Sequence, residues 1–388
     1  MRLEEICTVF TDGDWIESKD QSDDGIRLVQ TGNIGEGIYL EKEARAKYIS
    51  EETFEKLKCT EIFPGDILVS RLPDPVGRAC IIPEKEERMI TAVDCTICRP
   101  NESIISKEYL CYFMRSSAYY KRLLGSVTGT TRKRISRKNL GNVELEVPSK
   151  ERQMDVVEQL DCLVKVIESR KQELQLLDNL IKARFVEMFG DPVVHLYKGE
   201  TVKLDTIADK ITVGFVGEAS NEYVDEGVPY LRTQNIRVNR IDLKGLIYVN
   251  ESFHNKNQKS IIHPGDVVIS RVGANRGMAA MVPDSLPEAN IANCLIVGQT
   301  DNINSYYLAF YMNMSFGKRP QFGASVGSAQ GVVNTSILKK WEVYVPDRKL
   351  QDDFFEFSNQ VDKSKVAVQK ALKETQLLFD SLMQQYFG

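Results

Sequence analysis

Apolar residues recur at alternating steps of four and three along a stretch in the middle of the chain. The pattern begins at Val156 and ends at Met188, with lysine, glutamate and arginine on the remaining faces. This spacing predicts a long helix over 149–190 with one apolar stripe, as is typical of coiled coils. At about 1.5 Å per residue, such a helix spans on the order of 55 Å.

A second stretch over 347–388 carries a less regular stripe, which Ser364 and Thr375 interrupt. Neither helix is apolar all round, so each needs a partner for one face, and the nearest partner is the other helix. We therefore predict an intramolecular coiled coil; two ordinary core helices of compact domains are the alternative. The predicted seam residues are Leu160, Leu163, Ile167, Leu174, Leu177, Ile181, Val361, Val368, Leu378 and Leu382.

The segment before each helix contains short apolar, β-branched runs that predict a strand-rich α+β domain. Asp66–Ser70 and Asp266–Ser270 each follow a Pro-Gly turn signal. Residues 106–124 and 305–314 carry apolar positions at helical spacing. Val143–Val147 and Trp341–Val345 alternate, and we expect each to be a closing strand before a proline.

These two segments are copies of one another. Phe63-Pro-Gly-Asp-Ile-Leu-Val-Ser-Arg71 returns 200 residues later as His263-Pro-Gly-Asp-Val-Val-Ile-Ser-Arg271. The order of several further matches is kept, from Asn33 with Asn235 to Phe189-Gly190 with Phe387-Gly388. A shared order of this length predicts a duplication in which each half holds one globular domain followed by one helix. The predicted segments are 1–148, a helix over 149–190, a linker over 191–201, 202–346, and a helix over 347–388.

Composition fits a chain that works in a reducing, aqueous compartment. It has 388 residues, 42% of them hydrophobic and 27% charged, without a run of about 18 apolar residues or the apolar core of a signal peptide. The eight cysteines are scattered, which favours free thiols over a disulfide framework. We expect a cytoplasmic protein that does not enter a membrane.

The motifs of several enzyme classes do not occur in the sequence. There is no glycine-rich cofactor loop with an Asn/Asp-Pro-Pro-aromatic motif, no phosphate-binding Gly-x-x-x-x-Gly-Lys-Ser/Thr loop and no Gly-x-Ser-x-Gly turn. The three histidines form no close pair in sequence, and Cys95-Thr-Ile-Cys98 lacks a second pair. We therefore expect no catalytic residue, no bound metal and no cofactor. Asp66 and Asp266 are expected to support their turns rather than to act as catalysts.

A basic segment between Lys121 and Lys138 points to nucleic acid despite the net charge of −5. It has seven lysines and arginines and no acidic residue, with glycine, serine and threonine between them, a composition suited to contacts with phosphates. A solvated basic loop is the alternative. The matching segment of the second half replaces much of the charge with amides such as Gln330, and amides prefer adenine where arginine prefers guanine.

Two further polar clusters are candidates for contacts with DNA. One follows the duplicated strand and the other lies in the loops around Asn33 and Asn235. For each such residue, a structural or solvent-exposed role is the alternative to a contact with a base. The complete set of candidate DNA-binding residues is Gln30, Asn33, Arg71, Arg78, Arg132, Lys133, Arg134, Arg137, Arg232, Gln234, Asn235, Arg237, Arg271, Arg276, Gln330 and Asn334.

The whole chain resembles the specificity subunit of type I restriction-modification systems. The resemblance rests on the order of several motifs: the domain openings at Leu3–Trp15 and Val202–Gly214, the two Pro-Gly-Asp-(apolar)-Ser-Arg runs, the late loops that begin at Gly129 and Gly327, and Val-Pro followed by a helix start with Gln153 or Gln351. Each motif is weak alone, and their duplicated order is specific.

The resemblance implies two target-recognition domains, over 1–148 and 202–346, that each read one part of a bipartite double-stranded DNA target. The two long helices would pack antiparallel as a coiled coil, set the spacing and dock two methyltransferase subunits. Those subunits would carry S-adenosylmethionine, and a restriction and translocase subunit would use ATP and magnesium. The alternatives are a stand-alone site-specific DNA-binding protein, which the acidic balance disfavours, and a coiled-coil scaffold without DNA, which the basic segment disfavours.

Overall fold

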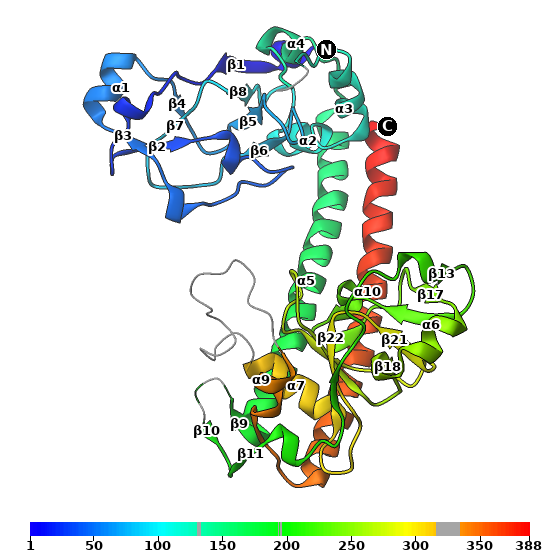
Figure 1. Cartoon of the computed structure of the whole chain (residues 1–388). Coiled ribbons are helices and arrows are strands. Elements are labelled where there is room, and N and C mark those ends of the chain that lie inside the picture. The colour runs from blue at the N-terminus through cyan, green and yellow to red at the C-terminus, as the bar shows by residue number, and fades with distance from the viewer. Residues whose placement is uncertain (130–132, 193, 195, 316–333) are drawn as a thin grey trace. The chain divides into compact units, whose positions relative to one another are not determined.

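The computed structural model of the chain describes residues 1–129, 133–192, 194, 196–315 and 334–388 (Figure 1). They divide into two compact units. Unit 1 comprises Met1–Gln172 with Gln369–Gly388, and unit 2 comprises Glu173–Val368. Each unit therefore contains one globular domain together with part of both long helices, whereas the sequence boundaries assigned each helix to a segment of its own.

Unit 1 contains two four-stranded sheets. The first is antiparallel in the order β1-β8-β5-β6, and the second has the order β3-β2-β7-β4 with β2 and β7 parallel. The run after the Pro-Gly turn forms β5, and all four of its residues are buried, which explains its unbroken apolar pattern. The strands are β1 (Cys7–Asp12), β2 (Ile26–Val29), β3 (Tyr48–Ile49), β4 (Glu61–Ile62), β5 (Ile67–Ser70), β6 (Ala79–Ile81), β7 (Met89–Thr91) and β8 (Cys95–Pro100).

The short helices of unit 1 begin at serine caps. Ser106 and Ser116 each accept a hydrogen bond from a backbone N–H in the first turn, so the predicted helical segment over 106–124 consists of two helices that meet near Ser116. The predicted strand at Val143–Val147 is also absent: this segment makes one isolated bridge, between Arg2 and Glu144. The helices are α1 (Glu51–Leu57), α2 (Lys107–Phe113), α3 (Ser117–Leu124) and α4 (Arg137–Gly141).

Unit 2 repeats this plan, with one more strand in its second sheet. Its antiparallel sheet has the order β12-β22-β19-β20, which matches β1-β8-β5-β6, and its second sheet has the order β13-β17-β14-β21-β18. The predicted closing strand is present here as β23, which pairs with β11. The strands of the two main sheets are β12 (Ile211–Val213), β13 (Tyr223–Val224), β14 (Val228–Leu231), β17 (Ile247–Val249), β18 (Ile261–Ile262), β19 (Val267–Ser270), β20 (Ala279–Met281), β21 (Ala289–Ile291) and β22 (Cys294–Val297).

Shorter elements complete unit 2. The predicted linker over 191–201 contains the hairpin of β9 and β10 and the first residue of β11, so it is part of the folded unit; Val193 and His195 lie outside the described residues. The remaining elements are β9 (Gly190–Asp191), β10 (Leu196–Tyr197), β11 (Thr201–Lys203), β15 (Ile236–Arg237), β16 (Arg240–Ile241), β23 (Glu342–Tyr344), α6 (Glu251–Lys256), α7 (Ser305–Ser315) and α9 (Thr335–Lys339).

Two helices of 40 residues each, α5 (Lys150–Phe189) and α10 (Arg348–Phe387), run where the sequence predicted them. In unit 1 the first part of α5 packs against the last part of α10 (Figure 1). Tyr386 of α10 donates a hydrogen bond to Gln159 of α5 at 2.8 Å. In unit 2 the last part of α5 packs against the first part of α10, and Lys365 lies 2.7 Å from Asp178. The helices are therefore antiparallel in both units, and the predicted fold class is confirmed.

Most predicted seam residues lie in these contacts, but Leu378 does not. Leu160, Ile167, Ile181, Val361 and Val368 are buried, and Leu163, Leu177 and Leu382 pack against the two cores, whereas Leu174 is partly buried. Leu378 is 50% exposed, and its neighbour Phe379 is buried instead. The seam of α10 follows a strict heptad through Ser358, Lys365 and Leu372 to Phe379, and the polar residues in it conceal that register in the sequence.

The described residues also show the state of the cysteines and the character of the helices. All eight cysteines are free; six are buried, Cys7 is partly buried and Cys162 is exposed. No described helix is long and apolar enough to cross a membrane.

Candidate nucleic-acid interface

The duplicated Pro-Gly-Asp turn has a structural role in both units. Gly65 and Gly265 adopt positive φ angles of 92° and 86°, which an L-residue rarely adopts. The carboxylate of Asp66 accepts the backbone N–H of Phe63 at 2.9 Å, and Asp266 accepts that of His263 at 3.1 Å. This agrees with the expectation that these aspartates support their turns.

The two aspartates differ in their cationic partners. Arg99 donates two hydrogen bonds to the Asp66 carboxylate, at 2.7 and 2.8 Å, and the side chain of Asp66 is 2% exposed. Asp266 instead lies 3.7 Å from the ammonium group of Lys210 and accepts the backbone N–H of Gln299. The turn is thus held by a bidentate, largely buried pair in unit 1 and by a longer contact in unit 2.

Arg71, the last residue of the duplicated motif in unit 1, is a buried arginine with internal partners. Its Nη2 donates to the backbone carbonyl of Val93, and its Nε lies 3.4 Å from Asp12. This second contact is an ion pair without an aligned hydrogen bond, because the Nε–H has no acceptor. Burial lowers the pKa of the guanidinium, which nevertheless stays charged, and Asp12 opposes the shift. These contacts favour a structural role for Arg71 over its predicted contact with DNA.

The basic segment of unit 1 reaches the same acidic residues. Arg134 forms an ion pair with Asp94 at 3.0 Å, and Arg137 lies 3.8 Å from Asp12. Both arginine side chains remain nearly half exposed. Lys133 is exposed, whereas Arg132 lies outside the described residues. Three cations thus surround two carboxylates here, and the cations on the surface are Arg134 and Arg137.

Unit 2 places Arg271 at the position of Arg71 without these carboxylates. Val213 pairs with Leu295 as Asp12 pairs with Thr96, and the backbone N–H of Arg271 donates to Asn293 as that of Arg71 donates to Asp94. The acidic positions of unit 1 are therefore occupied by valine and asparagine. Within the described residues, the partly buried guanidinium of Arg271 makes no ion pair, and its buried Nε has no hydrogen-bond partner.

Arg78 holds loops together in unit 1. It donates to the backbone carbonyls of Thr31, Ile34, Leu72 and Pro75, at distances between 2.7 and 3.2 Å. These contacts favour a structural role over the predicted contact with DNA.

In unit 2 a smaller side chain holds the equivalent loops together. The amide of Asn275 donates to the carbonyls of Thr233 and Ile236, which match Thr31 and Ile34. The neighbouring candidate Arg276 is partly buried and stays a prediction.

Asn33 and Asn235 brace equivalent turns. Each Oδ1 accepts a backbone N–H three residues earlier, at 3.0 and 2.9 Å, and each Nδ2 donates to a backbone carbonyl seven residues later. Both side chains are buried, at 5% and 3% exposure, so these contacts favour a structural role over the predicted contact with bases.

The remaining candidates near these turns are more accessible. Gln234 is exposed, and Gln30, Arg232 and Arg237 are partly buried. All four stay predictions as contacts with DNA.

The late loop of unit 2 lies mostly outside the described residues, and Gln330 with it. Asn334 is described: its Oδ1 accepts the backbone N–H of Ile337 at 2.9 Å and so caps α9. Ser136 caps α4 of unit 1 in the same way. Capping occupies the carbonyl end of the Asn334 amide, and the side chain remains exposed.

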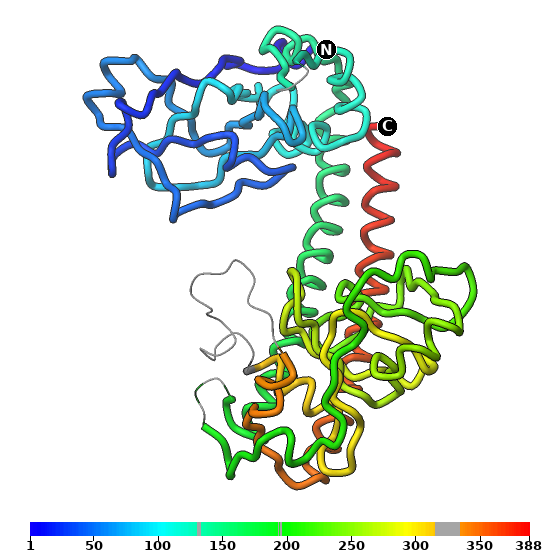
Figure 2. Tube along the Cα trace, viewed as in Figure 1, coloured from blue at the N-terminus to red at the C-terminus, as the bar shows by residue number. Residues whose placement is uncertain are grey.

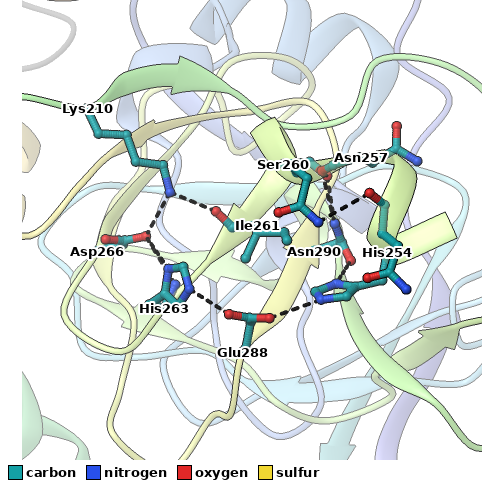
Figure 3. Close-up of polar contacts among 11 residues, drawn as sticks. Lys210, His254, Asn257, Ser260, Ile261, His263, Asp266, Glu288 and Asn290 are labelled. Carbon is teal, nitrogen blue, oxygen red and sulfur yellow. Dashed lines mark hydrogen bonds and ion pairs between the residues drawn. The ribbon is translucent and has the colours of Figure 1, made fainter. Parts of the chain in front are cut away.

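A polar cluster that the sequence did not predict joins the second sheet of unit 2 to α6. Glu288 accepts from the Nε2 atoms of His254, at 3.0 Å, and His263, at 2.6 Å, so two histidines that are nine residues apart in sequence share one carboxylate (Figure 3). His254 also contacts Asn290 through Nδ1 at 2.7 Å. No group of histidine, cysteine, aspartate or glutamate in the described part of the chain is arranged to hold a metal ion.

Cys95 and Cys98 also contribute to the interior. Cys95 packs in the core between the two sheets, and Cys98 packs in the core that includes the long helices. The two thiols therefore belong to different cores, and burial raises the pKa of Cys95 to about 12, so it stays protonated at neutral pH.

The duplicated architecture is matched by one protein family. The model of the type I restriction modification DNA specificity domain matches residues 1–179 and 198–376. The chain belongs to this family. The two matches cover both units, and the predicted duplication and the predicted family are thereby confirmed.

Individual relatives agree with this assignment. The chain is 26% identical over 130 residues to the specificity subunit of the type I restriction enzyme HindI of Haemophilus influenzae; the match covers 33% of this chain and 28% of that subunit. It therefore spans less than a third of the length of that relative.

Solved structures show the same fold. A chain from a study of complex assembly and conformational transition of a type I restriction-modification system superimposes with a TM-score of 0.63 at 17% identity, over 100% of this chain and 96% of that one. The type I restriction-modification S subunit from M. genitalium gives a TM-score of 0.56 at 14% identity, over 100% and 95%.

Within this pair of specificity domains, the structure divides the predicted contacts into two groups. Arg71, Arg78, Asn33 and Asn235 are committed to internal contacts. The exposed candidates that remain are Lys133, Arg134 and Arg137 in unit 1, and Gln234 and Asn334 in unit 2. The partly buried candidates that remain are Gln30, Arg232, Arg237, Arg271 and Arg276.

Proposed function

We propose that the chain is a type I specificity subunit in which each unit reads one part of a split double-stranded DNA target. The observation that carries this proposal is the double match to the DNA specificity domain, with different residues at equivalent sequence positions of the two late loops, where Arg132-Lys133-Arg134 matches Gln330-Gly331-Val332. Two copies with the same side chains would be expected to read the same sequence. Copies in which arginines and lysines are exchanged for amides are expected to prefer different bases.

The long helices would set the spacing between the two parts of the target. Each helix has 40 residues and contributes residues to both units. At about 1.5 Å per residue, such a helix spans on the order of 60 Å, which exceeds one turn of B-DNA at roughly 34 Å.

The same helices would dock two methyltransferase subunits. Large apolar side chains lie exposed on them: Met154, Leu377 and Leu378 in unit 1, and Leu176, Leu180 and Val366 in unit 2. These exposed side chains are available to pack against another protein. Partner subunits would supply the chemistry, with S-adenosylmethionine for methylation of adenine and with ATP and magnesium for restriction and translocation, while this chain supplies recognition.

The proposal is tested by co-expressing the chain with the methyltransferase encoded beside it in a host without other adenine methylation, and mapping methylated adenines by long-read sequencing. We expect one motif of two parts with a fixed gap. A stable complex that methylates no motif would favour a scaffold without DNA recognition. A chain that forms no complex but binds a defined sequence alone would favour a stand-alone DNA-binding protein.

A further inference from the structure

The end of the duplicated strand offers two arginines whose surroundings can be compared position by position. Ser70 pairs with Cys95 and Ser270 pairs with Cys294, so Arg71 and Arg271 follow the same point of the sheet. The adjoining strand ends at Asp12 in unit 1 and at Val213 in unit 2, at matching register. A difference between the two arginines therefore reflects their neighbours and not their place in the backbone.

In unit 1 the charge of Arg71 is compensated from within. Asp12 lies 3.4 Å from its Nε, the carbonyl of Val93 accepts from its Nη2, and burial makes this guanidinium poorly accessible. An anion from outside would have to compete with Asp12 for this group. The accessible cations of unit 1 are instead Arg134 and Arg137.

In unit 2 both acidic positions hold uncharged residues. Val213 replaces Asp12 and Asn293 replaces Asp94, and Arg271 makes no side-chain hydrogen bond or ion pair among the described residues. Residues 316–333, which lie outside them, contain Lys318 and Arg319 but no aspartate or glutamate, so they have no carboxylate to offer. The charge of Arg271 therefore lacks a compensating acid in this region of unit 2.

An arginine with a purely structural role would be expected to resemble Arg78, which donates to four backbone carbonyls. The Nε of Arg271 has no acceptor among the described residues, as is true of Arg71, but Arg271 also makes no ion pair with them and its side chain is partly exposed. Leaving a charged donor unsatisfied in this way costs free energy, unless a ligand supplies the acceptor. Its planar fork of N–H groups matches a phosphate or the O6 and N7 atoms of guanine.

We propose that Arg271 is a DNA-contacting residue of unit 2, and that the loss of the two acidic residues around it has converted a structural arginine into a binding one. This inference rests on the proposed function, because DNA is the anion that a specificity domain meets. Unit 1 uses Arg134 and Arg137 for the same purpose, and Arg71 stays internal.

The test measures binding of the complex of this chain with its methyltransferase to two labelled duplexes of about 40 base pairs, one with the mapped motif and one with the same composition scrambled. We expect Arg271→Gln to weaken binding of the motif duplex by about ten- to a hundredfold. If the contact is to a phosphate, both duplexes lose affinity and the slope of log K against log salt falls by about one. If it is to guanine, the loss is confined to the motif duplex.

A second variant tests the mechanism rather than the residue. Val213→Asp restores the carboxylate that unit 1 has at this position, and we expect it to weaken binding while Arg271 is still present. Combined with Arg271→Gln, it should weaken binding no further, because both changes remove the same interaction. Arg71→Gln is the matched control in unit 1, for which we expect a lower unfolding temperature and a change in affinity of less than about twofold, since a buried ion pair is broken there.

The outcomes separate the inference from the function on which it rests. If the wild-type complex does not distinguish the two duplexes, the proposed function fails. If it does, and Arg271→Gln binds as tightly as wild type with an unchanged unfolding temperature, the inference is wrong. Equal losses of affinity for Arg71→Gln and Arg271→Gln would overturn the distinction between the two arginines.

Discussion

The side chain that joins the second sheet to its neighbouring helix is an arginine in unit 1 and a glutamate in unit 2. In unit 1 Arg88 forms ion pairs with Glu61 and Glu51, at 2.9 and 2.6 Å, and its guanidinium lies 4.7 Å from the ring centre of Phe54. In unit 2 the matching position is Glu288, which accepts from His254 and His263 (Figure 3). Unit 1 therefore has an arginine between two glutamates where unit 2 has a glutamate between two histidines.

This difference shows that the two copies of the fold need complementary side chains at this position, but not the same residue types. The strand orders β1-β8-β5-β6 and β12-β22-β19-β20 are the same, and the course of the chain in both units can be followed in Figure 2. Some residues that differ between the units still have equivalent partners. Arg78 in unit 1 and Asn275 in unit 2 donate hydrogen bonds to equivalent backbone carbonyls. At Arg271 the partners are lost, and this difference is the one we connect with function.

The largest expected effect is the loss of stability when a buried phenylalanine is removed from the core of either unit. Phe379 closes the core of unit 1 and Phe354 that of unit 2, and both are buried. We expect Phe379→Ala and Phe354→Ala each to cost about 3–5 kcal/mol of stability, mainly in their own unit, because each leaves a cavity. Hydrogen exchange resolved by residue measures this directly.

The neighbour of Phe379 provides the control for the helix register. Leu378→Ala should cost less than about 1 kcal/mol, since that side chain is half exposed. A larger loss for Leu378→Ala than for Phe379→Ala would contradict the seam seen in unit 1.

The Pro-Gly-Asp turns should respond unequally to loss of the carboxylate charge. Asp66→Asn removes half of a bidentate pair and leaves Arg99 facing an amide, so we expect a loss of about 3 kcal/mol. Asp266→Asn weakens a 3.7 Å contact with Lys210 and should cost about 1 kcal/mol. Denaturant unfolding of both variants measures the difference, and equal losses would show that the longer contact in unit 2 is as strong as the bidentate pair.

The loss of stability on removing Arg78 or Asn275 should follow the number of hydrogen bonds that each side chain donates. Arg78→Ala leaves four backbone carbonyls without this donor, and we expect a loss of about 2 kcal/mol, with faster hydrogen exchange in 31–34 and 72–75. Asn275→Ala removes two such bonds and should cost about 1 kcal/mol. An unchanged stability for Arg78→Ala would return this residue to the candidates for DNA contact.

The smallest expected effect is the loss of the contact between Arg88 and Glu61 at low pH. Hydrogen bonds from Arg88 lower the pKa of Glu61 below its ordinary value, so its stabilising contribution is fully present above about pH 4.5 and is lost only as the pH falls through the lowered folded value.

Glu61→Gln is the control for this response. The difference in unfolding temperature between wild type and Glu61→Gln should be larger at pH 7 than at pH 3, because the carboxylate of Glu61 is charged at pH 7 and gains a proton as the pH falls through its lowered pKa. A constant difference would mean that the charge of Glu61 does not contribute to stability.

The duplication, the long helices and most of the seam could be predicted because they depend on periodic patterns in the sequence. Leu378 was placed wrongly because Lys365 and Ser358 occupy seam positions that an apolar pattern does not reveal. The break at Ser116 was missed because the apolar positions continue on both sides of the cap.

The candidate DNA contacts were harder to predict because an arginine looks the same in sequence whatever surrounds it. Arg71, Arg78 and Arg271 follow similar patterns, yet their roles depend on Asp12, on four carbonyls, and on the missing acidic residues respectively. The cluster around Glu288 was missed because His254 and His263 come together only through the packing of α6 against the sheet.

The central proposal is that the long helices set the gap between the two parts of the DNA target, and shortening both helices tests it most directly. Removing the heptads 168–174 and 369–375 together keeps the seam register and shortens each helix by about 10 Å. Methylated adenines would again be mapped by long-read sequencing. The account predicts a motif with the same two parts and a shorter gap. A motif with the same two parts and an unchanged gap would contradict it.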